Sequence, residues 1–280
     1  MVTAETQSQP IIRVQDVTVA YGDFVVMHDI SFEVQAGEVF VILGGSGCGK
    51  STLLKSMIGL NKPAQGRVLI EGRDIVTAEG ADLLAILRRI GVMYQNGALF
   101  GSMNLLENIG LVLEEFTDLP RAARETIART KLKAVNLEGS EYKMPAELSG
   151  GMRKRAAIAR AMALDPQILF LDEPSAGLDP ITSAQLDDLI LKLARTLQVT
   201  FVVVSHELPS IYKIADRAIM LDARAKTIIA IGKPSELRDY SDNPWVRQFL
   251  NRQTQESTES APPWTGGEST SLSLLSDRRL

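Results

Sequence analysis

A glycine-rich loop is the feature of this sequence that most constrains its fold. Residues 44–52 read GGSGCGKST and match the pattern G-x-x-x-x-G-K-[ST] from Gly44 to Ser51. The apolar run Val39–Leu43 precedes the loop, and the helix-like stretch KSTLLKSMIGL follows it. Glycines let successive N–H groups point toward an anion, and the start of the next helix adds partial positive charge. The pattern therefore predicts a strand, a phosphate-binding loop and a helix, in that order.

The loop assigns roles to individual side chains. Lys50 is expected to reach the β- and γ-phosphates of a nucleotide, and the Ser51 hydroxyl is expected to bind Mg²⁺. The alternative is a glycine-rich turn without a ligand. The full set of nucleotide-binding candidates in the loop is Gly44, Gly45, Ser46, Gly47, Cys48, Gly49, Lys50, Ser51 and Thr52.

Composition narrows the class of protein. The chain has 280 residues, of which 45% are hydrophobic and 23% charged, as in a globular protein with a sizeable core. Its 30 basic and 34 acidic side chains give a net charge of −4, so no nucleic-acid partner is expected. The N-terminus lacks a secretory pattern, and no apolar run approaches the roughly 18 residues needed to span a bilayer. We expect a cytoplasmic location, with any membrane-spanning part on another subunit.

The order of apolar runs predicts an α/β fold. The segments 11–22 and 29–37 favour an antiparallel β edge ahead of the loop. Helical stretches separate several short apolar runs, which favours a largely parallel core sheet. The predicted core strands are Val39–Leu43, Val92–Tyr94, Ile168–Leu171, Phe201–Val204 and Ala218–Leu221.

A helical insertion interrupts this core. Between Ser102 and Pro145 the sequence contains no convincing strand, and it predicts helices over Asn104–Phe116 and Arg121–Val135, the second with Pro120 in its first turn. We therefore expect an α/β phosphate-loop NTPase core with an antiparallel β edge and a helical subdomain inserted at about 102–165. The ATPase domain is expected to span 1–250, and the Ser- and Gly-rich segment 251–280 is expected to be disordered.

The segment AELSGGMRKRAAIARAMALDPQILFLDEPSAGLDP brings three motifs into one stretch. It resembles the nucleotide-binding subunit of ABC transporters, and the resemblance extends over about residues 11–235. Leu148–Met152 is similar to that family's signature sequence, Ile168–Glu173 to its Walker B strand, and Ser175–Asp179 to its D-loop. Outside the segment, Tyr21 matches the adenine-stacking aromatic, Gln95 the Q-loop glutamine and His206 the switch histidine.

The resemblance implies a role for each matching residue, with ATP and Mg²⁺ as the cofactors. Asp172 would hold Mg²⁺, with Ser51 and Gln95 as further metal candidates, and Glu173 would polarise the attacking water. The expected catalytic residues are Glu173, His206 and Gln95. Tyr21 would stack on adenine, whereas Ser149, Gly150, Gly151 and Asp179 would contact the ATP bound by a second copy in a head-to-tail dimer. Ordinary structural roles remain the alternatives, and His28 is interpreted as structural.

Two other features raise local questions. Arg153, Lys154 and Arg155 crowd the first turn of the helix that Ser149 begins, where the helix dipole disfavours cations. Either a negative ligand compensates them, or they form a solvated basic face. Cys48 could be a small space-filling residue, or the loop amides and Lys50 could stabilise its thiolate.

Shorter matches point to one branch of the family. Met152, the stretch Asn96–Phe100 and the fragment Val246–Leu250 are similar to ATPases of the Mla/MCE lipid-transport systems. This resemblance implies membrane permease subunits and a periplasmic MCE-domain protein as partners, and a position on the cytoplasmic face of the membrane. The apolar patch Gly97–Phe100 would face a partner. The alternatives are a soluble ABC ATPase that powers assembly of a cofactor or complex, and the ATPase of another compact importer.

The C-terminal segment carries one more helix signal. Asn243 is a good cap residue, Pro244 suits the first helical position, and apolar side chains follow at a spacing of four. We expect a short docking helix over Asn243–Leu250. Its apolar residues Trp245, Phe249 and Leu250 would either clasp the partner subunit or pack against their own.

Overall fold

A six-stranded sheet lies at the centre of the protein, whose computed structural model describes residues 9–252. The strand order is β10-β9-β3-β8-β7-β6, with β10 antiparallel to β9 and the other neighbours parallel. The strands are β3 (Val39–Gly44), β6 (Ile90–Met93), β7 (Ile168–Asp172), β8 (Thr200–Val204), β9 (Arg217–Asp222) and β10 (Thr227–Gly232). The parallel core predicted from the apolar runs is confirmed.

Both faces of this sheet are covered, which explains why its strands are continuously apolar. All residues of β3 are buried, and alternate side chains enter two different hydrophobic clusters. Phe40 and Ile42 face a cluster shared with the second sheet, whereas Val41 and Leu43 face the helices on the other side. This alternation is the period of two that a strand imposes.

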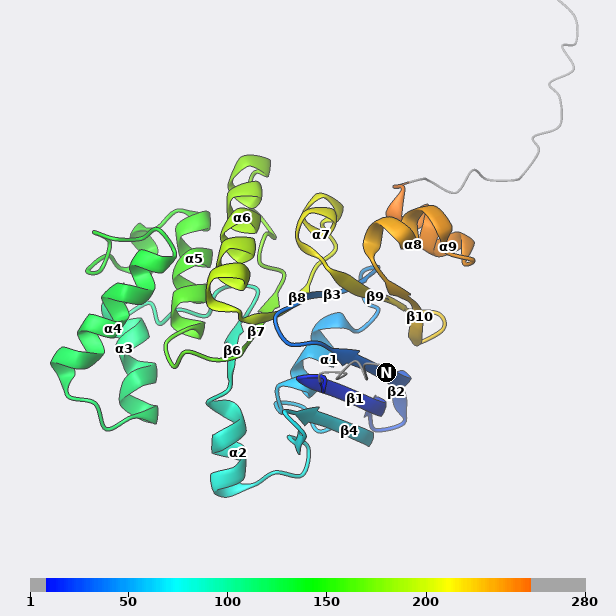
Figure 1. Cartoon of the computed structure of the whole chain (residues 1–280), viewed down its shortest axis with the longest axis horizontal. Coiled ribbons are helices and arrows are strands. Elements are labelled where there is room, and N and C mark those ends of the chain that lie inside the picture. The colour runs from blue at the N-terminus through cyan, green and yellow to red at the C-terminus, as the bar shows by residue number, and fades with distance from the viewer. Residues whose placement is uncertain (1–8, 253–280) are drawn as a thin grey trace, which may run out of the picture.

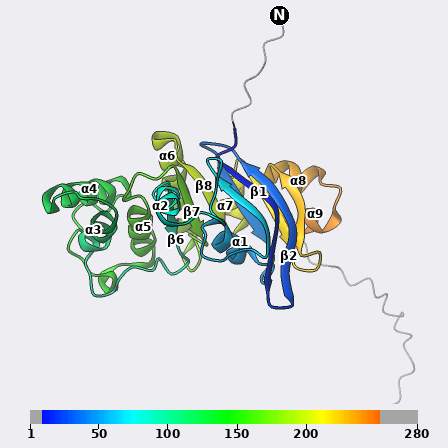
Figure 2. The same ribbon diagram turned by 90° about the horizontal axis from the view of Figure 1, so that it is seen from below.

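The second sheet is antiparallel and packs over α1 (Lys50–Met57), which lies between the two sheets (Figure 2). Its order is β2-β1-β4-β5, with β1 (Ile12–Tyr21), β2 (Phe24–Val34), β4 (Gln65–Ile70) and β5 (Arg73–Asp74). The predicted antiparallel edge is therefore present. Strand β2 begins earlier than expected because the pairing of β1 with β2 continues to the turn at Gly22-Asp23.

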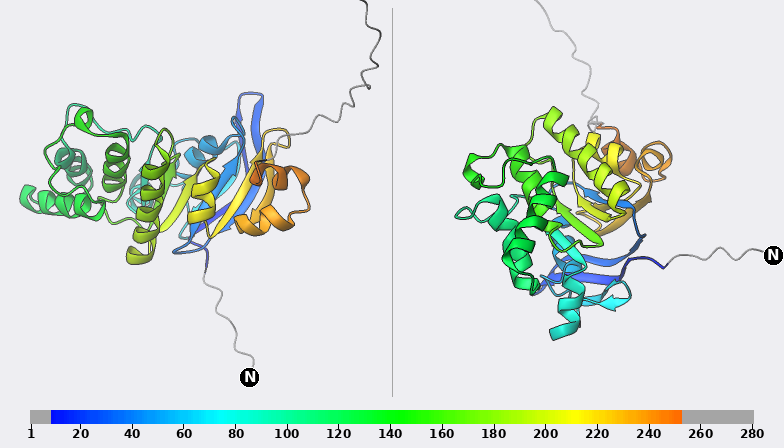
Figure 3. Two further views of the ribbon diagram at one scale, coloured as in Figure 1. Left: turned by 90° about the horizontal axis from the view of Figure 1, so that it is seen from above. Right: turned by 60° about the vertical axis from the view of Figure 1, so that its left-hand side comes forward.

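Helices cover the other face of the central sheet and extend beyond its β6 edge (Figure 1). Helices α6, α7, α8 and α9 lie over the sheet, while α3, α4 and α5 gather at the end beyond β6 (Figures 1 and 3). The helix bounds are α2 (Gly80–Leu87), which packs on the side of the second sheet, α3 (Leu105–Phe116), α4 (Arg121–Ala134), α5 (Gly150–Ala161), α6 (Pro180–Leu197), α7 (Leu208–Ile214), α8 (Pro234–Tyr240) and α9 (Pro244–Leu250), with a 3-10 turn at Pro145–Glu147.

The helices predicted in the insertion are found within one residue at each end. Asn104 caps α3 through a reciprocal pair of hydrogen bonds with Glu107, each 2.9 Å long. Pro120 is the N-cap of α4 rather than a residue of its first turn. At the far end of α5, a Cβ on Gly91 would lie 2.1 Å from the carbonyl oxygen of Ala161, so only glycine lets α5 approach β6 this closely.

Some elements were missed or displaced in the sequence prediction. Strands β4, β5 and β10 were not predicted: β5 has only two residues, both polar, β4 begins with three exposed residues, and the apolar run Ile228–Ile231 of β10 was overlooked. Strand β6 begins at Ile90, two residues before the predicted start. In the part of the chain that the structure describes, no helix is both long and apolar enough to cross a bilayer. The expected disorder of the tail falls almost entirely on residues 253–280, outside the described residues.

Candidate nucleotide-binding and catalytic site

The phosphate loop connects β3 to α1 and is shaped by glycines that no other residue replaces easily. Gly44 has φ 152°, and a Cβ there would lie 2.5 Å from the carbonyl oxygen of Leu221 on β9. Gly49 has φ 94°, and its Cβ would lie 2.4 Å from the Met27 side chain. Both positions have a backbone conformation that favours glycine, and at Gly44 a Cβ would also clash with backbone, whereas at Gly49 it would meet the flexible end of Met27. The loop therefore needs these two glycines for its fold as well as for a ligand.

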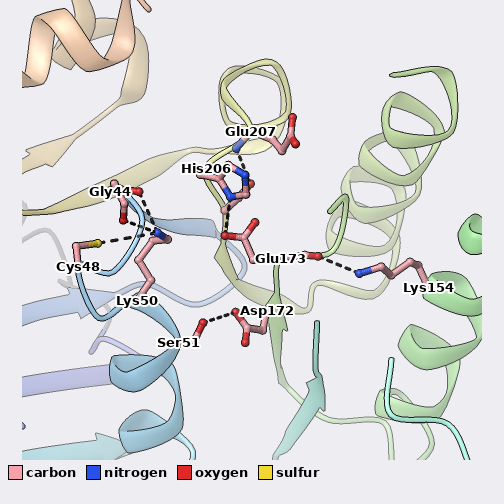
Figure 4. A network of polar contacts seen from close by, with 11 residues as sticks. Gly44, Cys48, Lys50, Ser51, Lys154, Asp172, Glu173, His206 and Glu207 are labelled. Atoms are coloured by element: carbon pink, nitrogen blue, oxygen red, sulfur yellow. Dashed lines mark hydrogen bonds and ion pairs between the residues drawn. The ribbon is translucent and has the colours of Figure 1, made fainter. Parts of the chain in front are cut away.

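Lys50 folds back over the loop. Its Nζ donates hydrogen bonds to the carbonyl oxygens of Gly44 (2.9 Å) and Gly45 (3.0 Å), and its side chain is buried. These bonds hold the ammonium group against the loop (Figure 4). An ammonium in this position fits the β- and γ-phosphates of a nucleotide.

Ser51 and Asp172 bring two oxygen donors together. The Ser51 hydroxyl donates a hydrogen bond to Asp172 Oδ1 at 2.9 Å, which joins the start of α1 to the end of β7 (Figure 4). Within residues 9–252, no group of three or more His, Cys, Asp and Glu side chains could enclose a metal by itself. Mg²⁺ is typically held by one or two carboxylates together with substrate phosphates and water. The Ser51–Asp172 pair fits Mg²⁺ on these terms.

Glu173 follows Asp172 at the end of β7 and has a strained backbone. Its φ is 50°, a conformation that non-glycine residues rarely adopt, and its N–H donates to the carbonyl oxygen of Val204 at 2.9 Å. Glu173 Oε1 lies 2.8 Å from His206 Nδ1, while Oε2 is buried without a hydrogen-bond partner (Figure 4). A buried, unpaired carboxylate oxygen is a site for a donor such as water.

A single cavity of about 580 Å³ collects most of the predicted site residues. It is lined by the phosphate loop together with Gln95, Glu173 and His206, from four different parts of the chain. Val26 and Phe249 also line it, and the sequence analysis did not foresee either one at the site. Phe249 comes from α9, so the C-terminal helix reaches the mouth of the phosphate-loop cavity.

Tyr21 lies outside this set of lining residues, in the β1–β2 hairpin. Its side chain is 57% exposed, and its hydroxyl accepts a hydrogen bond from Asn61 Nδ2 at 2.9 Å. An exposed ring held by its hydroxyl can still offer a flat face to a base, so the adenine role stays a prediction. The other histidine, His28, is paired with neighbouring Asp29 at the surface and does not reach the cavity.

The signature residues lie outside the phosphate-loop cavity, and Gly150 lines a second pocket that Gln95 also borders. Ser149 caps α5 by accepting a hydrogen bond from the Met152 N–H (3.3 Å), and Asp179 caps α6. Hydrogen bonds from the Thr182 hydroxyl and from the first N–H groups of α6 lower the pKa of Asp179. A Cβ on Gly151 would lie 2.4 Å from Thr182 Cγ2, so close packing on α6 already requires this glycine. None of the described lining residues of the phosphate-loop cavity belongs to this group.

The three cations at the start of α5 differ in burial: Lys154 is buried, Arg155 is half-buried, and Arg153 is exposed, as in the solvated alternative. Arg153 Nη1 donates to the carbonyl oxygen of Leu148 at 2.7 Å, and Arg155 Nε donates to that of Gly151 at 3.4 Å. Lys154 is buried and donates to the carbonyl oxygens of Gln95 and Glu173, and this burial lowers the pKa of its ammonium group. Backbone carbonyls therefore compensate the cations, a solution that leaves no trace in the sequence.

Cys48 is the space-filling residue of the two alternatives. Its side chain is buried, and burial raises the pKa of its thiol despite Lys50 Nζ at 3.9 Å. The direction of this shift favours the space-filling role over a stabilised thiolate. The Lys50 charge and the backbone N–H groups of Lys50 and Cys48 act in the opposite direction, but burial of the sulfur beside Gly44 outweighs them.

Helix α9 also packs differently from the clasp hypothesis. Asn243 caps it as predicted, but Val246 and Leu250 are buried in the core of their own subunit. The Tyr212 hydroxyl on α7 donates to the carbonyl oxygen of Leu250 at 2.7 Å. Leu250 is therefore unavailable to a partner, whereas Trp245 remains 40% exposed and stacks edge-on against Phe249.

Comparisons with known proteins agree with this geometry. A family model described as ABC transporter matches residues 27–176. The chain is 43% identical over 240 residues to the probable ribonucleotide transport ATP-binding protein mkl of Mycobacterium leprae, a match that covers 86% of this chain and 68% of that protein. It is 41% identical over 241 residues to the intermembrane phospholipid transport system ATP-binding protein MlaF of Escherichia coli (strain K12), covering 86% and 88% of the two chains.

Solved structures show the same fold. The ATP-binding cassette MJ0796, in a dimeric post-hydrolysis state bound to ADP and Pi, matches with a TM-score of 0.72 and 30% identity, covering 79% of this chain and 98% of that one. The ABC transporter component cbiO1 from Clostridium perfringens matches with a TM-score of 0.75 and 26% identity, covering 88% and 96%.

Proposed function

The chain belongs to the ABC transporter family of ATPases, and from this premise we propose that its ATP hydrolysis drives a phospholipid or another hydrophobic substrate through a separate membrane permease. The observation that supports the lipid assignment is the 41% identity to MlaF over 88% of that protein's length. The short matches at Met152 and Val246–Leu250 point the same way. The hydrolytic function rests on the family and on the cavity that joins the phosphate loop to Glu173 and His206.

The residues of the cavity divide the work of hydrolysis. The loop N–H groups and Lys50 hold the phosphates of ATP, so that the γ-phosphate lies toward Glu173 and His206. The free oxygen of Glu173 accepts a hydrogen bond from the attacking water and orients it, while Oε1 is held by His206. His206 contacts the γ-phosphate, and Gln95 contacts the metal or the water. The charge that develops on the phosphoryl oxygens is stabilised by groups already in place.

Mg²⁺ would be held by Ser51 and Asp172, with Gln95 as a further ligand, and it would supply neutralisation of phosphate charge. The contribution of the protein is the direct Ser51–Asp172 contact, which fixes both oxygens at one point between α1 and β7.

A second copy of the chain would complete the site. Within the described chain, the phosphate-loop cavity is lined by none of Ser149, Gly150, Gly151 and Asp179, although Gly150 shares a second pocket with Gln95. In a head-to-tail dimer these residues would contact the ATP held by the partner copy. Dimeric forms of the similar cassette MJ0796 support this arrangement. The helical subdomain at about 102–165 carries the signature residues to that interface.

The permease is proposed to bind near the Q-loop, which places the subunit at the cytoplasmic face of the membrane. Phe100 directly follows the Q-loop and is half exposed, and the Arg160 guanidinium lies 5.9 Å from its ring. An adjacent groove of about 760 Å³ between α3 and α4 presents both acidic and basic side chains. An MCE-domain protein would be a further partner of the same assembly.

Ribonucleotide transport is the second candidate, because the mkl protein is named for it and is 43% identical. A soluble ATPase that powers assembly of a cofactor or complex is the third. The cavity binds ATP in all three cases, so the transported substrate has to be identified from the partner subunits rather than from this chain.

Reconstitution would separate these candidates. The tagged chain is purified from its native membranes, and the co-purifying membrane subunits are reconstituted with it in proteoliposomes containing fluorescent phospholipid. We expect ATP-dependent lipid movement that is lost with Glu173→Gln. Movement of labelled ribonucleotide without lipid movement would favour the second candidate, and recovery of the chain with a soluble scaffold instead of membrane proteins would favour the third.

A further inference from the structure

Helix α5 holds the backbone of the Q-loop at several points. Arg160 Nη1 donates to the carbonyl oxygen of Ala98 at 2.6 Å, and Nη2 donates to that of Gly97 at 3.2 Å. One turn and a half earlier on the helix, Lys154 Nζ donates to the carbonyl oxygen of Gln95. Two cations of α5 therefore fix the path of residues 95–98.

Lys154 also reaches the other side of the site. Its Nζ donates to the carbonyl oxygen of Glu173 at 3.1 Å, and only 8% of the residue is exposed. Figure 4 shows the Lys154 side chain extending from α5 toward the end of the β7 strand. A buried ammonium is unfavourable unless its donors are satisfied, so the conformation of Lys154 is tied to both carbonyls.

The carbonyl that Lys154 holds belongs to a residue under backbone strain. Glu173 has φ 50°, and such conformations persist only where the surroundings impose them. Three backbone contacts impose it here: the N–H of Glu173 is bonded to Val204, and its carbonyl oxygen accepts from Lys154 and from the N–H of Ala176 (3.2 Å). Of these three contacts, two are made by backbone groups, and the third is made by the Lys154 side chain of α5.

We infer that Lys154 is a positioning residue for ATP hydrolysis, which ties Gln95 and Glu173 to the helix that begins at Ser149. The inference rests on the proposed role of Glu173 as the residue that orients water. Because one ammonium group bridges the Q-loop and the end of β7, a displacement of α5 moves the backbone at both residues together. When α5 contacts a partner copy, or the Q-loop contacts a permease, Lys154 would transmit the displacement to the backbone of Glu173 and so change the position of its carboxylate.

The test compares three substitutions of Lys154 with a matched exposed lysine. Lys154→Met keeps the length of the chain and removes the donors, Lys154→Gln keeps a donor that cannot bridge both carbonyls, and Lys154→Arg can donate to both. Lys192→Met on the exposed side of α6 is the control. Each full-length variant is measured for thermal unfolding, for ATP affinity with a fluorescent nucleotide, and for steady-state kcat and KM.

We expect Lys154→Met to lower kcat at least about tenfold while ATP affinity changes by less than about twofold. Lys154→Gln should show a smaller loss in the same direction, and Lys154→Arg should recover most of kcat. A folded Met or Gln variant with the kcat of the wild type would overturn the inference, as would a loss of ATP affinity that accounts for the whole loss of activity.

Glu173→Gln is measured beside them so that the two proposals can fail separately. Normal turnover by Glu173→Gln would reject the role of Glu173, and with it the premise of the inference. An inactive Glu173→Gln beside a fully active Lys154→Met would leave the function in place and reject only the role of Lys154.

Discussion

The phosphate loop and the signature segment differ in whether one copy of the chain brings their site residues together in a cavity. The loop shares a cavity with Gln95, Glu173 and His206, so its ligand contacts are assembled within a single fold. The signature residues Ser149–Gly151 cap and pack their own helices and line no part of that cavity within the described chain. One region gathers its site residues in a single cavity of one copy, and the other presents its residues outside that cavity. This contrast is what a site divided between two copies predicts.

The largest expected effect concerns the complete region. Glu173→Gln preserves the shape of the side chain but removes the carboxylate, so hydrolysis should fall by about 10²- to 10⁴-fold. ATP binding should persist, because the loop and Lys50 are untouched, and the ATP-bound dimer should accumulate. Phosphate release and light scattering with ATP and Mg²⁺ measure both. Turnover close to that of the wild type would remove Glu173 from its proposed role.

A complementation experiment tests the division between the two regions directly. Lys50→Ala disables the loop, and Ser149→Arg places a bulky side chain on the signature surface, so each homodimer should be inactive. In a head-to-tail heterodimer, however, one site pairs the intact loop of one copy with the intact signature of the other. Mixing equal amounts should then recover about a quarter of wild-type activity, because half of the dimers are mixed and each has one of two sites.

Control measurements identify the outcomes that would contradict a site divided between two copies. Ser149→Arg alone should bind ATP with nearly the affinity of the wild type, since the signature surface lies outside the loop cavity. No recovery on mixing, despite subunit exchange shown by differently tagged chains, would contradict the divided site. Loss of ATP binding by isolated Ser149→Arg would show that both regions act within one copy.

The sequence predicted the first region better than the second for a physical reason. Backbone N–H groups and a few side chains at fixed spacing create the phosphate loop, so a local pattern specifies both its shape and its ligand. The apolar run that places Asp172 and Glu173 at the end of β7 is equally local. What was missed depends on distant contacts: Lys154 finds carbonyls 19 and 59 positions away, and Phe249 reaches the loop from the C-terminal helix. Charge and hydrophobicity alone carry no record of such partners.

The C-terminal helix offers a third effect, in stability. Leu250→Ala removes a side chain that is 2% exposed and should lower the free energy of unfolding by about 2–5 kcal/mol. Trp245→Ala removes a side chain that is 40% exposed and should lower it by about 1 kcal/mol or less. Urea unfolding of the two variants measures the difference. If α9 packs on its own subunit as the structure has it, the larger loss belongs to Leu250.

One of these variants, Trp245→Ala, also tests the remaining part of the clasp hypothesis, in which the exposed ring contacts the partner subunit. Trp245→Ala in the Glu173→Gln background should weaken the ATP-bound dimer if the exposed ring meets the partner. An unchanged dimer would confine α9 to the stability of its own chain and to the mouth of its own cavity. A truncation after Gln253 retains all of α9 and is the matched control, for which we expect no change in either measurement.

The smallest effect is expected at Cys48, where the loop and the core meet. Burial raises the pKa of this thiol, so the reactive thiolate is scarce near neutral pH, and the buried sulfur is also sterically shielded. Maleimide should therefore react with the folded chain much more slowly than with the chain in urea, and the folded rate should keep rising at pH values where an ordinary cysteine is already ionised. Mass spectrometry follows the adduct, with Cys48→Ala as the labelling control.

ATP with Mg²⁺ should slow the reaction further because it restrains the loop that covers the sulfur. Rapid labelling of the folded chain at neutral pH would contradict this prediction, because it would mean that the phosphate loop opens often enough to expose the Cys48 sulfur. The phosphate loop would then not be preformed, and the difference between it and the signature segment would be smaller.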